Sequence, residues 1–240
     1  MDHSLAVKKD GTVWGWGNNG YGRLGDGTAI TRYTPVQVVG LSGVVSVAAG
    51  WMSSLALKQD GTVWGWGFNE QGQLGDGTMK SKLTPVQVVG LSGATVLVAG
   101  DLHALAVKQD GTVWGWGNNG QGQLGDGTTT TRLTPVQVSG LSGVTSIDTS
   151  YGYSLAVKQD GTVWGWGDNY VGQLGDGTTT QRMTPVQVPA FSGVVVIRAG
   201  GMHSLALKQD DSTWAWGYNY YGQLGNGSIW ESHSPVRVLE

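Results

Sequence analysis

A fifty-residue repeat constrains this chain more than any other feature. Two tryptophans separated by one glycine, Trp14 and Trp16, recur without insertion or deletion as Trp64 and Trp66, Trp114 and Trp116, Trp164 and Trp166, and Trp214 and Trp216. Such a period is typical of repeat arrays, in which each repeat is one supersecondary unit and neighbours share a core. We therefore expect a single repeat domain over residues 1–240, with repeats at residues 1–50, 51–100, 101–150, 151–200 and 201–240.

Each repeat has the pattern of four short antiparallel strands. In the third repeat, an alternating run at residues 104–108 leads into an Asp110-Gly111 hairpin turn and a second strand at residues 112–117. A loop rich in Asn, Gly and Asp follows, then strands at residues 134–138 and from residue 144 onwards. Nothing has helical periodicity. The predicted fold is all-β, a β-propeller built from five 50-residue four-stranded blades, either a closed five-blade ring or an incomplete, open propeller.

The tryptophan-bearing strand has one bulky and one nearly bare face. Side chains alternate along a strand, so Trp14 and Trp16 point one way while Val13, Gly15 and Gly17 point the other. We expect the indoles of one repeat to lie on the glycines of a neighbouring repeat, with about 150–250 Å² buried by each tryptophan. A stacking platform for sugars or bases is the functional alternative.

The composition and net charge of the chain limit the classes of partner that it can bind. The chain has 42 glycines, no cysteine and a net charge of −3. Disulfides and thiolate metal sites are excluded, and the charge gives no electrostatic case for nucleic-acid binding. No apolar run approaches the ~20 residues of a membrane helix. We predict neither a nucleic-acid nor a membrane partner, and the sequence leaves the compartment open.

Catalysis and cofactors have little support in the sequence. His3, His103 and His203 share one repeat position, but they belong to non-adjacent repeats and cannot share a metal. Four aspartates each precede a glycine and are interpreted as turn residues, at Asp26, Asp76, Asp126 and Asp176. No nucleophile–base pair or phosphate-binding loop is present. We predict a non-enzyme with no cofactor and no metal.

The longest stretch that the repeats share is similar to the sequence repeat of a known family. Residues 99–138 read AGxxHxLAVKQDGTVWGWGxNxxGQLGDGT…TPVQV, and the other repeats contain degraded forms of it. This string resembles the repeat of the regulator of chromosome condensation. The resemblance implies a propeller whose inner strand is the VVSVAAG run, followed outward by HSLAL, TVWGWG and TPVQV. It also implies, by analogy only, guanine-nucleotide exchange on a small GTPase or inhibition of a β-lactamase, for which no contact residues can be matched here.

The chain departs from this family pattern in its number of strands. Family members commonly close with seven blades, whereas this sequence has five repeats. The first repeat lacks the inner strand that residues 44–49 supply to the second, so there are five sets of outer strands and four inner strands. An unpaired strand edge and uncovered apolar faces favour association. We therefore predict self-association through the first and last repeats.

Recognition is expected where the repeats differ. The loops joining strands one to two and three to four share one rim and vary, whereas the Lys-Gln-Asp-Gly and Gly-Leu-Ser-Gly turns of the other rim are nearly constant. Aromatic and methionine side chains are enriched in interfaces. The candidate binding residues are Trp51, Met52, Phe68, His103, Tyr151, Tyr153, Tyr170, His203, Tyr218, Tyr220, Tyr221 and Trp230.

These residues predict a non-enzymatic propeller scaffold that binds a protein partner through its variable rim. Carbohydrate binding by the rim aromatics is one alternative. An amplified or designed repeat scaffold without a natural ligand, its rim varying by drift, is another.

Overall fold

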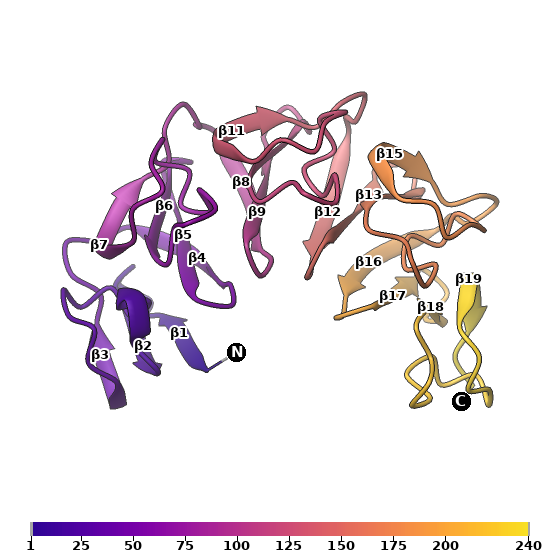
Figure 1. Cartoon of the computed structure of the whole chain (residues 1–240), viewed down its shortest axis with the longest axis horizontal. Helices are drawn as coiled ribbons and strands as arrows, with labels where there is room; N and C mark the ends of the chain where they lie inside the picture. The colour runs from indigo at the N-terminus through magenta and orange to yellow at the C-terminus, as the bar shows by residue number, and fades with distance from the viewer. Residues whose placement is uncertain (1, 240) are drawn as a thin grey trace. The chain divides into compact units, whose positions relative to one another are not determined.

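The computed structural model describes residues 2–239, which form antiparallel sheets joined by tight turns and one 3-10 turn (Figure 1). The chain divides into two compact units whose boundary passes through the third repeat. The first unit contains Met1–Gln109, Trp114–Asn118 and Thr131–Val136, and the second contains Asp110–Val113, Asn119–Thr130 and Gln137–Glu240. Each unit is described by itself.

The first unit holds two whole sheets and most of a third. Its strands are β1 (His3–Val7), β2 (Val13–Gly17), β3 (Arg32–Gln37), β4 (Val44–Ala49), β5 (Ser53–Lys58), β6 (Val63–Gly67), β7 (Lys82–Gln87), β8 (Ala94–Ala99), β9 (His103–Lys108), β10 (Val113–Gly117) and β11 (Arg132–Gln137), with the 3-10 turn η1 at Gly20–Gly22. The first sheet has three described strands, in the order β1-β2-β3, and the next has four, β4-β5-β6-β7. Residues 2–239 thus contribute three strands to the first sheet and four to the second.

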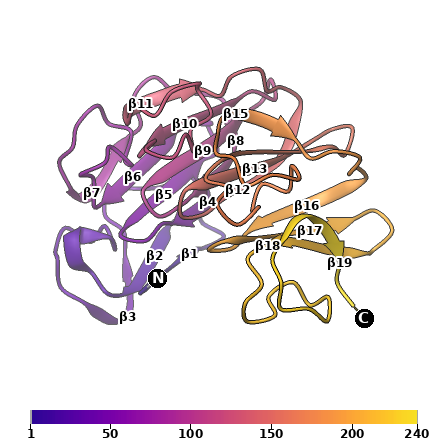
Figure 2. The same ribbon diagram turned by 45° about the vertical axis from the view of Figure 1, so that its right-hand side comes forward.

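The second unit holds the fourth and fifth sheets. Its strands are β12 (Val144–Thr149), β13 (Tyr153–Lys158), β14 (Val163–Gly167), β15 (Arg182–Gln187), β16 (Val194–Ala199), β17 (His203–Lys208), β18 (Thr213–Gly217) and β19 (Ser232–Arg237). Figure 2 shows β16 to β19 from a second direction. Strands neighbouring in sequence are neighbours in each sheet, so the predicted order of four strands is confirmed.

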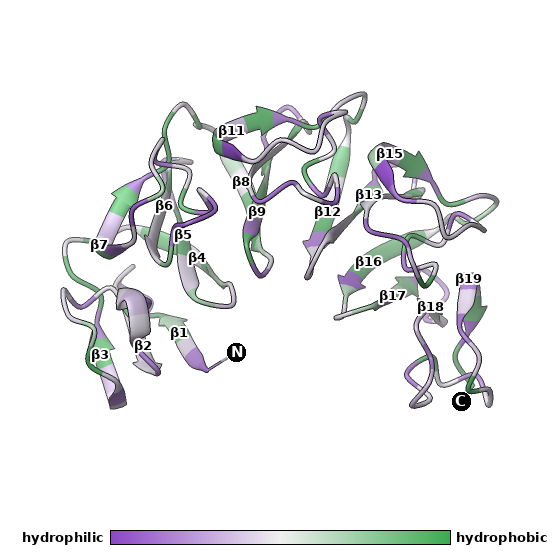
Figure 3. Ribbon diagram, in the orientation of Figure 1, coloured by the Kyte–Doolittle hydropathy of each residue, from purple (hydrophilic) through white to green (hydrophobic). Residues whose placement is uncertain are grey.

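The apolar core lies between successive sheets. In the second unit, Leu155 and Val163 of the fourth sheet pack in one cluster with Ala206 and Trp216 of the fifth. Figure 3 shows hydrophobic colour along most of β16. Sheets that are apolar on a face must bury it against another element, and here the neighbouring repeat supplies that element.

The two tryptophans of a repeat have different environments. Trp66, Trp116, Trp166 and Trp216 are fully buried. The first tryptophan of each pair is half-buried beneath a lysine, as where Lys158 Nζ lies 5.6 Å from the Trp164 ring centroid. The second tryptophan is fully buried in repeats two to five, Trp16 is half-buried, and first-position residues such as Trp64 and Trp214 pack against the edge of the core.

The buried indoles do contact glycine, but the predicted glycine is wrong. A β-carbon placed at Gly125, in the loop of the preceding repeat, would lie 2.9 Å from Trp166. The strand glycine Gly165 instead faces Leu155 and Leu174 of its own repeat, at 3.2 and 3.3 Å. The bare strand face thus makes room for the leucines of the same sheet, and the loop glycine makes room for the indole.

Each seam between repeats also carries a repeated polar contact. The carbonyl of Gln173 accepts hydrogen bonds from Trp216 Nε1 at 2.9 Å and from Ser204 Oγ at 2.7 Å. The same carbonyl position, in Arg23, accepts from Trp66 Nε1 and Ser54 Oγ at 2.9 and 2.7 Å. A buried indole N–H needs a hydrogen-bond partner, so this contact both satisfies the N–H group and fixes the orientation of the ring.

Two expectations concern how the repeats sit across the whole chain, namely the closure of a ring and the unity of the domain. Both stay predictions.

No helix among residues 2–239 has the length and apolarity to cross a membrane.

Candidate binding rim

A buried asparagine holds the loop between the third and fourth strands of each sheet. Asn169 Nδ2 lies 3.1 Å from each of Asp176 Oδ1, Thr178 O and Thr180 O, and its Oδ1 accepts from Leu174 N at 3.0 Å. These contacts reach across as many as eleven residues and make the loop a rigid platform. The sequence analysis missed this residue, although its recurrence was visible as Asn19, Asn69, Asn119, Asn169 and Asn219.

The aspartate of each loop does more than form a turn. Asp176 Oδ1 accepts from the backbone and hydroxyl of Thr178, and Asp176 Oδ2 pairs with Arg182 at 2.7 Å. Although burial acts to raise the pKa of Asp176, the hydrogen bonds from Thr178 and Arg182 outweigh it and hold the pKa below its usual value. The fifth repeat has Asn226 and Ser232 at these two positions, so its loop keeps the turn without the charges.

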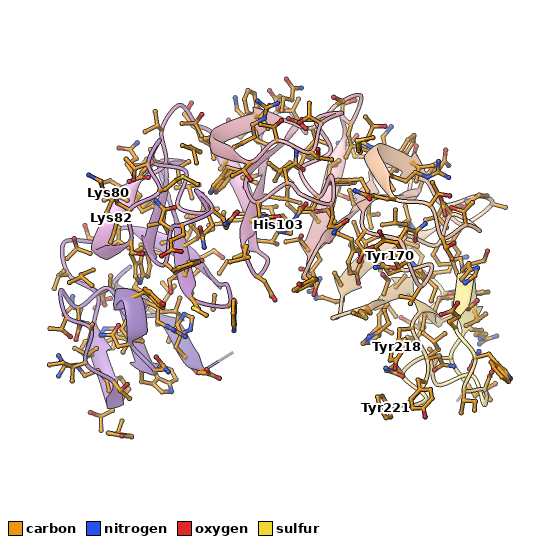
Figure 4. All side chains as sticks on the ribbon, viewed as in Figure 1. Lys80, Lys82, His103, Tyr170, Tyr218 and Tyr221 are labelled. Atoms are coloured by element: carbon orange, nitrogen blue, oxygen red, sulfur yellow. The ribbon has the colours of Figure 1, made fainter. Side chains whose placement is uncertain are left out.

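Half of the twelve predicted binding residues have exposed side chains. These are Trp51, Tyr151, Tyr170, Tyr220, Tyr221 and Trp230. Four others are half-buried, namely Met52, Phe68, His203 and Tyr218. Figure 4 shows Tyr170, Tyr218 and Tyr221 on the loops of the second unit.

The remaining two candidates are buried and cannot be surface contacts. His103 is 1% exposed, and burial lowers its pKa to about 3. Tyr153 is equally buried, its pKa is raised by burial, and its hydroxyl donates to His203 O at 2.6 Å. The sequence placed both on the rim because they follow a variable loop, but each is the first residue of its strand and points into the packed sheets.

The structure brings only some of the candidates together. Tyr218, Tyr220 and Tyr221 form a cluster in the fifth repeat, with centroids 5.0–6.5 Å apart. In the first unit, Phe68 meets the ring of Tyr21 edge-on at 5.0 Å. Tyr21 was not among the predicted residues, although Tyr221 at the same repeat position was.

The opposite rim has a different chemistry. A shallow polar hollow lined by Ser192, Gly193, Lys208, Gln209 and Asp210 recurs in the second sheet at residues 42–43 and 58–60. Its aspartate is occupied locally, since Asp210 Oδ1 accepts from Ser212 N and Oγ. Across residues 2–239 no group of three or more acidic or histidine side chains could hold a metal ion.

Four-stranded antiparallel sheets that pack face to face along a repeat, with the connecting loops gathered at their ends, are the blades of a β-propeller. The chain belongs to the RCC1-like domain family, which matches residues 1–239.

Solved structures share this fold. Human WBSCR16 is 27% identical with a TM-score of 0.89, and all of this chain covers 65% of that protein. Yeast RCC1 (Prp20), in its structure with Kap60, is 24% identical with a TM-score of 0.88 and 59% of its chain covered. This chain therefore spans about three fifths of the length of these neighbours. No curated protein matches it.

Proposed function

We propose that the chain is a protein-binding scaffold that recognises its partner through the variable loop rim and performs no catalysis. One observation carries this proposal. Exposed aromatic side chains, namely Tyr170, Tyr220 and Tyr221, lie on loops that a buried asparagine holds in place. Rigid aromatic anchors lose little conformational entropy on binding and are enriched among interface hot spots.

The related structures give this proposal a precedent. The yeast relative has been solved with Kap60, and Prp20p was characterised for binding to Gsp1p and histones. At 24% identity these structures carry the fold alone, so the partner of this chain remains to be identified by experiment.

Alanine variants of the rim test the proposal. Tyr170→Ala, Tyr220→Ala and Tyr221→Ala should each weaken a co-purified partner's affinity, by about 1–2 kcal/mol at a hot spot. The matched control is Gln159→Ala or Gln209→Ala on the opposite rim, which should leave the affinity unchanged. Loss of binding only in the control variants would place recognition on the opposite rim. Retention of the chain on a glycan array, without binding to a protein, would favour the carbohydrate alternative.

Self-association is a second proposal, favoured by two complementary uncovered faces. Leu83 of the second repeat packs on Gly22 of the first, where a β-carbon would lie 2.5 Å from the leucine side chain. At the equivalent positions, Tyr33 is 95% exposed and Gly222 has no neighbouring atom within 4 Å. A contact between Gly222 of one molecule and Tyr33 of another would repeat the packing of Leu83 on Gly22 within the chain.

Light scattering tests this association. The 240-residue chain should show a mass above 25.2 kDa that rises with concentration, and Tyr33→Ala should lower it. Thr134→Ala, within a seam that is already filled, is the control. A mass of one chain at every concentration would contradict the proposal and favour closure of the chain on itself.

A further inference from the structure

The fifth repeat contains an aromatic pocket that the other loops do not have the side chains to build. Its volume is about 400 Å³, and it lies between residues 218–220 and residues 229–231. The pocket is lined by Tyr218, Asn219, Tyr220, Ile229, Trp230 and Glu231. The corresponding loop of the fourth repeat has Asp168, Thr179, Thr180 and Gln181 at the positions of Tyr218, Ile229, Trp230 and Glu231.

The wall of this pocket is held in place by the side-chain amide of Asn219. Asn219 Nδ2 donates to Ser228 O at 2.9 Å and to Trp230 O at 3.0 Å, while Asn219 Oδ1 accepts from Leu224 N at 2.9 Å. The segment that carries Trp230 is therefore held against the segment that carries the tyrosines. The rings of Tyr218 and Tyr220 are nearly parallel, at 24°, with centroids 6.5 Å apart. A ligand would meet a preformed aromatic surface.

The pocket does not depend on what packs against the fifth repeat. In the second repeat, where a further repeat covers the packing face, the residues equivalent to Tyr220, Ile229, Trp230 and Glu231 are still exposed, namely Glu70, Met79, Lys80 and Ser81. By contrast Gly72 is buried there and its equivalent Gly222 is exposed. The pocket positions thus belong to the loop rim and not to the face between repeats.

The chemistry of the lining selects a cation. Three aromatic rings offer electron-rich faces, and Glu231 adds a carboxylate whose Oε1 lies 3.0 Å from His233 Nε2. Elsewhere the chain supplies its own cation to a half-buried indole, as where Lys8 Nζ lies 4.0 Å from the Trp14 centroid, but no lysine or arginine is among the lining residues of this pocket. The amide of Asn219 is already engaged, so the hydroxyls of a sugar could pair only with the two tyrosine hydroxyls, the indole of Trp230 and the carboxylate of Glu231.

We propose that this pocket binds a quaternary ammonium group, supplied by a trimethylated lysine side chain of a protein partner. The group combines a positive charge with apolar methyl surface, which is the combination that aromatic cages recognise. The inference rests on the proposed function, because it assigns a ligand chemistry to one part of the same rim.

A trimethyllysine peptide is the probe, titrated by calorimetry against the intact chain. The same peptide with carbon in place of the quaternary nitrogen has the same shape without the charge, and it should bind about tenfold more weakly. Free choline should bind, but more weakly than the peptide. Equal affinity for the charged and neutral peptides would overturn the proposal, as would binding of choline without binding of the peptide.

Variants locate the site. Trp230→Ala should weaken peptide binding by about tenfold or more, Trp230→Phe should retain part of it, and Glu231→Gln should lower it by about threefold. Thr180→Ala is the matched control, because the exposed Thr180 occupies the position of Trp230 in a repeat without the other aromatics. Trp230 is 78% exposed, so its replacement leaves the core untouched. Unchanged binding in Trp230→Ala would overturn the assignment.

A gain of function gives an independent check. Asp168→Tyr, Thr179→Ile, Thr180→Trp and Gln181→Glu, introduced together with Trp230→Ala, should restore peptide binding on the fourth repeat. Failure to bind any ammonium probe, while Tyr170→Ala still weakens a protein partner, would refute this inference and leave the proposed function standing. If no rim variant weakened either peptide binding or partner binding, both this inference and the proposed function would be refuted.

Discussion

Alanine at Gly125 tests whether the loop glycine is the socket for the core indole. Gly125 has a φ of +66°, and a β-carbon there would lie 2.9 Å from Trp166 Cδ1, Trp166 Nε1 and Val138 Cγ1. Gly140 has the same φ of +66° but no atom within 4 Å of that position. The pair thus separates the cost of backbone conformation from the cost of crowding.

The magnitudes follow from those two costs. A side chain in the left-handed region costs about 1–2 kcal/mol, which both variants share. Crowding of a packed site adds about 1–3 kcal/mol, which only Gly125→Ala incurs. We expect the free energy of unfolding to fall by about 1–3 kcal/mol more for Gly125→Ala than for Gly140→Ala.

Chemical denaturation followed by far-ultraviolet circular dichroism measures this difference. Since repeat arrays can lose cooperativity, hydrogen exchange of the Trp166 indole N–H, which donates to Gln123 O at 2.8 Å, provides a local readout. Equal midpoint shifts and equal exchange in the two variants would refute the socket.

Three further results are expected. Gly165→Val should destabilise the chain by about 1–3 kcal/mol in urea denaturation, because Leu155 and Leu174 occupy the space, whereas Thr180→Val on the loop should have little effect; equal shifts would contradict the packing. Lowering the pH from about 6.5 towards 4 should reduce the free energy of unfolding by up to about 1.4 kcal/mol per pH unit through His103, because the imidazole binds a proton in the unfolded state but not when buried with a pKa of about 3. His103→Phe should remove that part of the pH dependence, and an unchanged pH dependence would argue against burial of the ring. Asp176→Ala should raise local hydrogen exchange across its loop by removing the contacts to Thr178 and Arg182, while Asn226→Ala, which lacks the ion pair, should do so less; the reverse order would show that the charge pair does not hold the loop.

Much of the fold could be predicted because the repeat supplies many examples of one pattern. The Asp110-Gly111 turn, the alternation around Trp114 and the order of strands follow from local rules about turns and strand faces. The partner of each indole could not be predicted in this way. Its glycine lies in a loop of the preceding repeat, and the path of that loop depends on contacts such as Asn169 to Thr180, which span eleven residues.

The rim was predicted less well for a similar reason. Tyr151 and Tyr153 stand two residues apart at the same loop, yet one is 62% exposed and the other 1% exposed. The difference arises where the loop ends and the strand begins, a boundary that sequence patterns locate poorly. Tyr218 and Trp230 were predicted as binding residues, but the pocket they line was not, because they are twelve residues apart and the hydrogen bond from Asn219 to Trp230 O is not visible in the sequence.

The recurring carbonyl at Arg23 and Gln173 has a consequence for how such a chain can change over evolutionary time. Each junction presents the same carbonyl to the same indole, and every junction except the one at Ala104 adds the same serine hydroxyl, so the indole contact is interchangeable between junctions. Unequal recombination that adds or removes fifty residues in register recreates a complete junction at the point of exchange. An exchange out of register leaves a buried carbonyl without its donors, at a cost of about 1–3 kcal/mol. The array can therefore lengthen or shorten by whole repeats. The need to pair the buried carbonyl at each junction favours a constant repeat length of fifty residues.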